Sequence, residues 1–119
     1  MKSDNVVVDK SKAFAIRIVN MYRFLREEKS EFVMSKQVLR CGTSIGANVK
    51  EAIRGQSTAD FIAKMNIALK EASETEYWLE LLKETNYLSE EMCGSILSDC
   101  VELIKLLTAI VKTAKRGET

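Results

Sequence analysis

The residues of this chain best suited to chemistry are polar and charged side chains that recur along two neighbouring helical segments. In the segment 38–54 they are spaced four, four and three residues apart, so a helix of about 3.6 residues per turn carries them in one stripe: Arg40, Ser44, Asn48 and Glu51. In the segment 57–82 two carboxylates, Glu71 and Glu74, stand among apolar residues. An arginine near paired carboxylates can serve acid–base chemistry, metal binding or a structural ion pair.

A turn at Gly55-Gln56 would fold these two segments into an antiparallel pair. Residues equally far from the turn would then meet, which places Arg40 beside Glu71 and Glu74. A planar guanidinium can hold a carboxylate through two hydrogen bonds, so we predict a largely buried ion pair. Replacing Arg40 with alanine would then cost about 3–5 kcal/mol, because a buried carboxylate would lose its partner.

Catalysis and metal binding are the less favoured roles for these carboxylates. Helical bundles that hold two metal ions use a Glu-x-x-His motif, and the chain contains no histidine. Gly42 and Gly46 do not have the spacing of a phosphate-binding loop, and there is no nucleophile elbow. We therefore predict no enzymatic activity, no metal and no cofactor, and a structural polar network that comprises Arg40, Ser44, Asn48, Glu51, Glu71 and Glu74.

The cysteines give little support to a reactive site. The chain has three of them, Cys41, Cys93 and Cys100, and an odd number without paired spacing argues against a disulfide framework. Three thiols without histidine also make a poor zinc site. We predict that they are small buried hydrophobic residues in a protein of the reducing cytoplasm.

The elements that position these side chains are predicted to be helices only. Residues 1–8 are interpreted as a flexible arm, and residues 9–116 as one domain with helices at 10–28, 34–55, 57–85 and 89–115. Short links between the helices favour antiparallel neighbours. The predicted fold class is all-α, an antiparallel up-down-up-down four-helix bundle.

Each predicted helix has an apolar face for a shared core. In the third helix this face repeats at intervals of four and three residues, which is typical of near-parallel helix packing. Gly42 lies on the core face of the second helix, where it allows a close approach of a neighbouring helix. The predicted core residues are Phe14, Ile18, Met21 and Leu25; Val38, Ile45, Val49 and Ala52; Phe61, Met65, Ala68, Ala72, Thr75, Leu79 and Leu82; and Met92, Ile96, Cys100, Leu103, Leu107 and Ile110.

Composition and charge fit such a domain. The 119 residues include no proline and are 46% hydrophobic and 29% charged, a mixture typical of a folded helical protein. No apolar run reaches the length that spans a membrane, and no signal peptide is recognised. The formal net charge of +1 means that any contact with nucleic acid must come from a local patch.

Two kinds of surface stand out. The third and fourth helices carry more apolar residues than one core face needs, which favours a homo-oligomer. Outward-facing cations are candidate contacts to RNA or DNA, and their alternative role is that of a solvated helix surface. These cations are Arg23, Arg26, Lys50, Arg54, Lys112, Lys115 and Arg116. A protein-binding assembly module without nucleic-acid contact is the alternative function.

The run LRCGTSIGANVKEA followed by ADFIAKMNIALKEASETEYWLELL resembles the bacterial four-helix-bundle proteins encoded in intervening sequences of 23S ribosomal RNA genes. The resemblance extends from about Phe14 to about Leu107. It implies an up-down-up-down bundle that assembles into ring-like pentamers. A related branch serves as the accessory protein of diversity-generating retroelements, where it binds nucleic acid and a reverse transcriptase. The resemblance therefore implies a non-enzymatic oligomer, possible contact with RNA or DNA, and a possible protein partner.

Overall fold

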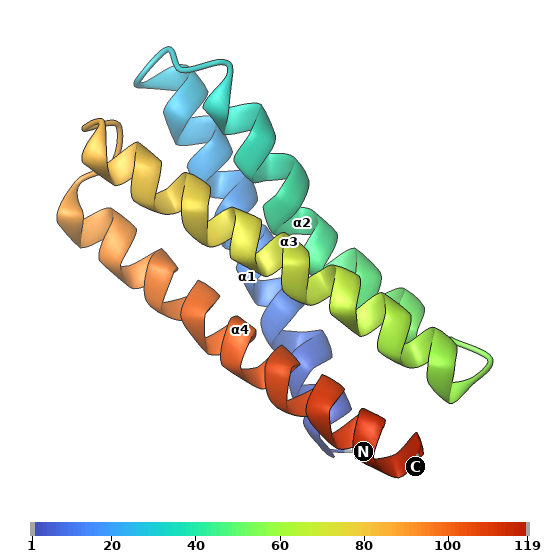
Figure 1. Ribbon diagram of the computed structural model, residues 1–119. Coiled ribbons are helices and arrows are strands. Elements are labelled where there is room, and N and C mark those ends of the chain that lie inside the picture. Colours follow the sequence, from blue (N-terminus) through green and yellow to red (C-terminus); the bar gives the residue numbers. More distant parts are fainter. Residues whose placement is uncertain (1, 119) are drawn as a thin grey trace.

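The chain folds into a bundle whose helices run up and down in sequence order (Figure 1). Within residues 2–118, which the computed structural model describes (side chains for 6–117), there are four α-helices and no strand. They are α1 (Lys2–Glu27), α2 (Met34–Ile53), α3 (Thr58–Glu84) and α4 (Glu90–Glu118). The bundle is elongated, with extents of 49 × 21 × 19 Å. The predicted fold class is confirmed, and no helix in the described part of the chain is long and apolar enough to cross a membrane.

The helices pack as a ring around one core. α1 packs on α2 and α4, and α3 packs on the same two helices, so α1 and α3 face each other diagonally. The seam between α1 and α4 is the loosest of the four. The α1–α2 and α3–α4 loops share one end of the bundle, and the α2–α3 turn shares the other end with both termini (Figure 1).

The core faces that the sequence predicts are mostly confirmed. Their members on α1, α2 and α3 are buried except Phe61, which is half-buried while its neighbour Ile62 is fully packed. On α4 the prediction fails at Met92, whose side chain is 41% exposed. Cys93 takes the core position instead, because the apolar stripe of α4 begins one residue later than predicted.

The predicted flexible arm at 1–8 is wrong for the residues that the structure describes, because α1 begins at Lys2. Val7 is fully buried and belongs to the core cluster. Together with Ser11 and Phe14, it extends the four-and-three spacing of the α1 core face toward the N-terminus. The burial of Val7 outweighs the low helix propensity of the Val6-Val7-Val8 triplet.

At the α1–α2 seam, a glycine allows the two helices to approach each other closely. A Cβ atom built on Gly42 would lie 2.8 Å from Cγ1 and 2.9 Å from Cγ2 of Ile18. At Gly46 the nearest atom is the backbone oxygen of Ser11, at 3.4 Å. The predicted close approach is therefore confirmed, and α1 is the helix that approaches.

Side chains and left-handed residues set the helix ends. Ser57 Oγ accepts a hydrogen bond from Asp60 N at 3.1 Å, and Ser89 Oγ accepts one from Met92 N at 3.1 Å, as expected of N-caps. Ser30 and Asn86 have φ values of 51° and 68° and turn the chain after α1 and α3. These caps fix where the loops at each end of the bundle begin.

Candidate functional site

The predicted ion pair between α2 and α3 is present. Arg40 Nη1 lies 3.2 Å from Glu71 Oε2, and Arg40 Nη2 lies 2.5 Å from Glu74 Oε2. The indole Nε1 of Trp78 donates to the same Glu74 oxygen at 3.0 Å. One guanidinium therefore bridges two carboxylates that lie one helical turn apart, and Trp78 adds a contact that the sequence analysis did not predict.

The predicted burial of this ion pair is wrong. The side chain of Arg40 is 51% exposed, whereas those of Glu71 and Glu74 are 19% and 37% exposed. The polar stripe of α2 lies at the outer edge of the α2–α3 seam, where water reaches the guanidinium. The pair is thus a surface ion pair, which contributes far less than a buried one.

The remaining members of the predicted network do not join this pair. Ser44 Oγ donates to the carbonyl of Arg40 at 2.6 Å, and Asn48 Nδ2 donates to the carbonyl of Ser44 at 2.8 Å. Both side chains thus bond to their own helix. Glu51 forms a separate ion pair with Lys64 at 3.3 Å. Instead of one network, two separate groups of ion pairs join α2 and α3. We call the group formed by Arg40, Glu71 and Glu74 the Arg40 clasp.

The electrostatics of the Arg40 clasp favour a structural role. The hydrogen bond from Trp78, followed by that from Arg40, lowers the pKa of Glu74 below its usual value. The same contact with Glu74 raises the pKa of Arg40. Both groups stay charged at neutral pH, so Glu74 is poorly suited to exchange protons. Among the described residues, no group of three His, Cys, Asp or Glu side chains is arranged to hold a metal ion.

All three cysteines are free and buried, as predicted. Burial raises the pKa of Cys41 and Cys93, and raises that of Cys100 to about 12. The Cys93 and Cys100 thiols each lie 3.3 Å from a backbone carbonyl oxygen of α3, at Leu79 and Ala72. Such thiols are protonated and shielded from solvent, so they are poor nucleophiles.

The predicted nucleic-acid contacts fall into two groups at opposite ends of the bundle. Arg23 and Arg26 lie on α1 near the α1–α2 loop. The other five lie near the α2–α3 turn and the C-terminal end of α4: Lys50, Arg54, Lys112, Lys115 and Arg116. The two groups cannot form one continuous patch on a single protein molecule that is 49 Å long.

Two further ion pairs between α1 and α4 were not predicted. Arg17 Nη1 lies 2.5 Å from Asp99 Oδ2, while its Nη2 donates to Ser95 Oγ at 2.9 Å. Lys10 pairs with Glu102 nearer the end of the bundle that holds the termini. The sequence contains a usable signal, because all these residues flank the apolar stripes of the first and fourth helices. Recognising it requires knowing that α1 neighbours α4.

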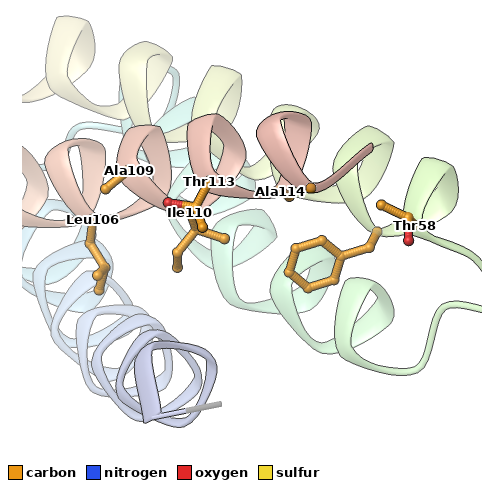
Figure 2. A pocket seen from close by; sticks show the side chains of 8 residues that line it. Thr58, Leu106, Ala109, Ile110, Thr113 and Ala114 are labelled. Carbon is orange, nitrogen blue, oxygen red and sulfur yellow. The ribbon is translucent and has the colours of Figure 1, made fainter. Parts of the chain in front are cut away.

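An apolar surface cavity of about 400 Å³ lies between the start of α3 and the last turns of α4 (Figure 2). Phe61 from α3 and Leu106, Ile110 and Ala114 from α4 line it. Only the hydroxyls of Thr58 and Thr113 bring polar side-chain groups to its edge. The described lining residues of this cavity include no ionisable side chain.

The fold and the ion pairs between its helices define the class as an all-α four-helix bundle. The model of the 23S rRNA-intervening sequence protein family matches residues 3–109, and the chain belongs to that family. It is also similar to a crystal structure from Bacteroides thetaiotaomicron, described as a protein of unknown function from the S23 ribosomal protein family. That protein shares 64% identity and a TM-score of 0.91, over 92% of this chain and 98% of the other. No curated protein matches the chain.

Proposed function

We propose that this protein is a non-enzymatic, oligomeric scaffold that contacts nucleic acid through the C-terminal half of α4. The observation that carries the proposal is the distribution of charge along this helix. Residues 103–117 contain four cations and no carboxylate. We refer to these cations, all exposed, as the α4 basic face: Lys105, Lys112, Lys115 and Arg116.

The α4 basic face offers a geometry that suits a phosphate backbone. Lys105, Lys112 and Arg116 are spaced by seven and four residues and share one side of the helix. Within the described residues, Lys105, Lys112 and Lys115 have no carboxylate within 4.0 Å, unlike Lys10 and Arg17 at the α1–α4 seam. Cations that carry no ion pair remain available to displace counterions from nucleic acid.

Assembly would make such a small patch effective. A single copy of the α4 basic face offers few contacts, and the net charge of +1 gives no long-range attraction. Apolar side chains such as Ile67 and Tyr77 on α3 are 42% and 58% exposed and supply surface for an oligomer. Several copies in a ring, five by resemblance, would present several patches to one polymer and raise its apparent affinity.

The family is described as that of the 23S rRNA-intervening sequence protein, which makes nucleic acid the polyanion to test first. The test is fluorescence anisotropy with structured RNA and duplex DNA across a salt series. We expect the α4 basic face to bind both, with affinities that fall steeply with salt. Lys112→Glu combined with Lys115→Glu should abolish this binding. Lys12→Glu combined with Lys70→Glu changes the net charge equally at exposed positions of α1 and α3, and should retain most of the binding.

The alternative is a protein-binding assembly module. Its support is the same exposed apolar surface, with the ring presenting a face to a protein partner. An intact oligomer that binds neither RNA nor DNA at low salt would contradict the nucleic-acid proposal and favour this module. Equal loss of binding in both double variants would show that net charge, and not the α4 basic face, is responsible.

A further inference from the structure

The end of the bundle opposite to the α4 basic face carries a cluster of aromatic and cationic side chains. We call it the loop cluster, and it lines a surface cavity of about 320 Å³: Tyr22, Arg23, Arg26, Glu27 and Phe32. The guanidinium carbon of Arg26 lies 5.4 Å from the ring centroid of Tyr22 and 5.6 Å from that of Phe32. Arg26 Nη1 also donates a hydrogen bond to Tyr22 Oη at 2.8 Å. A planar cation is thus held against two aromatic rings.

The α1–α2 loop holds Phe32 in place although its ring is 49% exposed. The buried carboxylate of Glu31 accepts hydrogen bonds from the backbone N–H groups of Val33, Met34 and Ser35 at 3.2, 3.1 and 2.7 Å. Ser35 Oγ donates to the Glu31 carbonyl at 2.8 Å and closes the loop from the other side. An exposed ring on a fixed backbone loses little conformational entropy when a flat ligand stacks on it.

The charges around the loop cluster suit a phosphate-linked ligand, although weakly. Arg23, Arg26 and Lys29 are exposed, and Glu27 and Glu28 offset part of their charge. Electrostatic attraction at this end is therefore smaller than at the α4 basic face. Affinity here must come mainly from contact with the rings and the guanidinium plane.

We propose that the loop cluster binds an unpaired base of a single-stranded nucleic acid, stacked on Phe32 and Arg26. The inference deepens the proposed function and rests on it. Every base has a π face that can lie on an aromatic ring or a guanidinium plane. Bases inside a duplex are already stacked on each other and cannot enter. The Glu27 carboxylate at the cavity edge can accept a hydrogen bond from an exocyclic amino group of the base.

The two ends of the molecule then recognise different features. The α4 basic face contacts phosphates and does not distinguish single strands from duplexes. The loop cluster adds affinity only for a strand with free bases. The assembled protein should therefore prefer single-stranded RNA to a duplex of equal length, and this preference should depend on Phe32.

Anisotropy titrations of the full chain with labelled oligoadenylate of about 12 nucleotides and a duplex of equal length test this inference. Phe32→Leu keeps an apolar side chain but removes the ring, so we expect about tenfold weaker binding of oligoadenylate and unchanged duplex binding. The matched control is Val33→Ala, which shortens a 73% exposed apolar side chain of the same loop without removing a ring and should change neither. Arg26→Gln should weaken oligoadenylate binding more than the same change at Arg54.

A second measurement reports stacking directly. Phe32→Trp places an indole at the cavity, and oligoadenylate should quench its fluorescence beyond any change of the native Trp78. The stacking inference would be overturned if Phe32→Leu bound oligoadenylate as tightly as the unmodified protein, or if it lost affinity equally for oligoadenylate and the duplex. Neither result would contradict binding at the α4 basic face. Absence of binding to either probe at low salt would overturn both. Quenching of Phe32→Trp by oligoadenylate but not by the duplex would support the inference even if Phe32→Leu is unstable.

Discussion

Arg40 holds Glu71 and Glu74 at a seam that is open to water, and this exposure sets the strength of the clasp. Because the guanidinium is half exposed, water and salt screen its attraction to the two carboxylates. The Arg40 clasp therefore stabilises the orientation of α2 against α3 without dominating the stability of the bundle. The aliphatic part of the Arg40 side chain adds some packing along the seam.

We expect Arg40→Ala to destabilise the protein by about 0.5–1 kcal/mol, not by the larger amount that a buried pair would cost. Urea unfolding measures this difference, and high salt should reduce it because a solvated ion pair is screened. Arg23→Ala, at an exposed position of α1, is the control and should have a smaller effect. A loss of several kcal/mol at Arg40 would mean that the guanidinium is shielded from water.

Burial of the Cys100 thiol should make the free energy of unfolding decrease at alkaline pH. Its thiol has a pKa of about 12 in the folded protein, whereas an unfolded thiol ionises near 8.5. The folded state thus keeps a proton that the unfolded state releases. The contribution is complete below about pH 8.5 and is lost as the pH rises toward 12, at about 1.4 kcal/mol per pH unit.

Urea unfolding from pH 8 to about pH 10.5 tests this dependence. Cys100→Ala should be less stable at neutral pH, since it removes a buried side chain, yet its stability should fall less steeply with pH. Parallel curves for the two proteins would contradict the role of Cys100. Cys41 and Cys93, whose pKa values burial also raises, contribute in the same direction and remain in both proteins.

At the scale of elements, the tight α1–α2 seam contrasts with the open outer surface of α4. A Cβ added at Gly42 would overlap Cγ1 and Cγ2 of Ile18. These two atoms are bonded directly to the β-carbon of Ile18, so they move little while the α1 backbone stays in place. At Gly94 in α4, no atom lies within 4 Å of the position that a Cβ would occupy. Substituting alanine at each of these glycines therefore distinguishes the effect of packing on stability from the effect of helix propensity.

We expect Gly42→Ala and Gly94→Ala to have opposite effects on the free energy of unfolding. Both changes improve helix propensity by about 1 kcal/mol. At Gly42 the new methyl group overlaps Ile18, and overpacking of about 1–3 kcal/mol outweighs that gain. Gly94→Ala should therefore raise the midpoint of thermal unfolding and Gly42→Ala should lower it. Stabilisation by both would show that α1 and α2 can separate without cost.

Considering the molecule as a whole, several large apolar side chains are exposed on a single copy of the chain. Ile16, Ile67 and Tyr77 are 55%, 42% and 58% exposed, and the last two lie on the same helix. Apolar surface of this kind is expected to be covered in solution by further copies of the chain. Oligomerisation also supports the avidity on which weak nucleic-acid contacts depend.

Light scattering coupled to size exclusion should give a mass several times the 13.4 kDa of one chain. Exposed large apolar side chains occur on every helix and are not concentrated on α3 and α4, as the sequence analysis expected. The proposed interface is on α3, which carries Ile67 and Tyr77, so Ile67→Asp should reduce this mass and Ile16→Asp on α1 should not. A stable 13.4 kDa particle at micromolar concentration would contradict the assembly. Loss of assembly in Ile16→Asp alone would move the interface to α1.

The bundle and most of its core can be predicted from the amino-acid sequence alone. Apolar residues with a helical period must be buried somewhere, and the same spacing that predicts the helices also selects their inner faces. Even the partners of Arg40 followed from equal distances to the turn at Gly55-Gln56, because an antiparallel hairpin has only one register about a short turn. The sequence analysis does not predict that α1 extends through Val7. The low helix propensity of the valine triplet favours an arm, whereas burial of Val7 in the core favours a helix.

The exposure of each polar group and the contacts between distant residues depend on how the helices pack, which the sequence pattern does not give. Periodicity places a residue on a face of its helix, but exposure depends on how closely the next helix covers that face. The side chain of Arg40 is therefore half exposed although it lies at the α2–α3 seam. Arg17 pairs with Asp99 because α1 packs beside α4. The loop cluster has the same origin. Arg26 and Phe32 are six residues apart across a turn, and only the loop capped by Glu31 stacks the guanidinium on the ring.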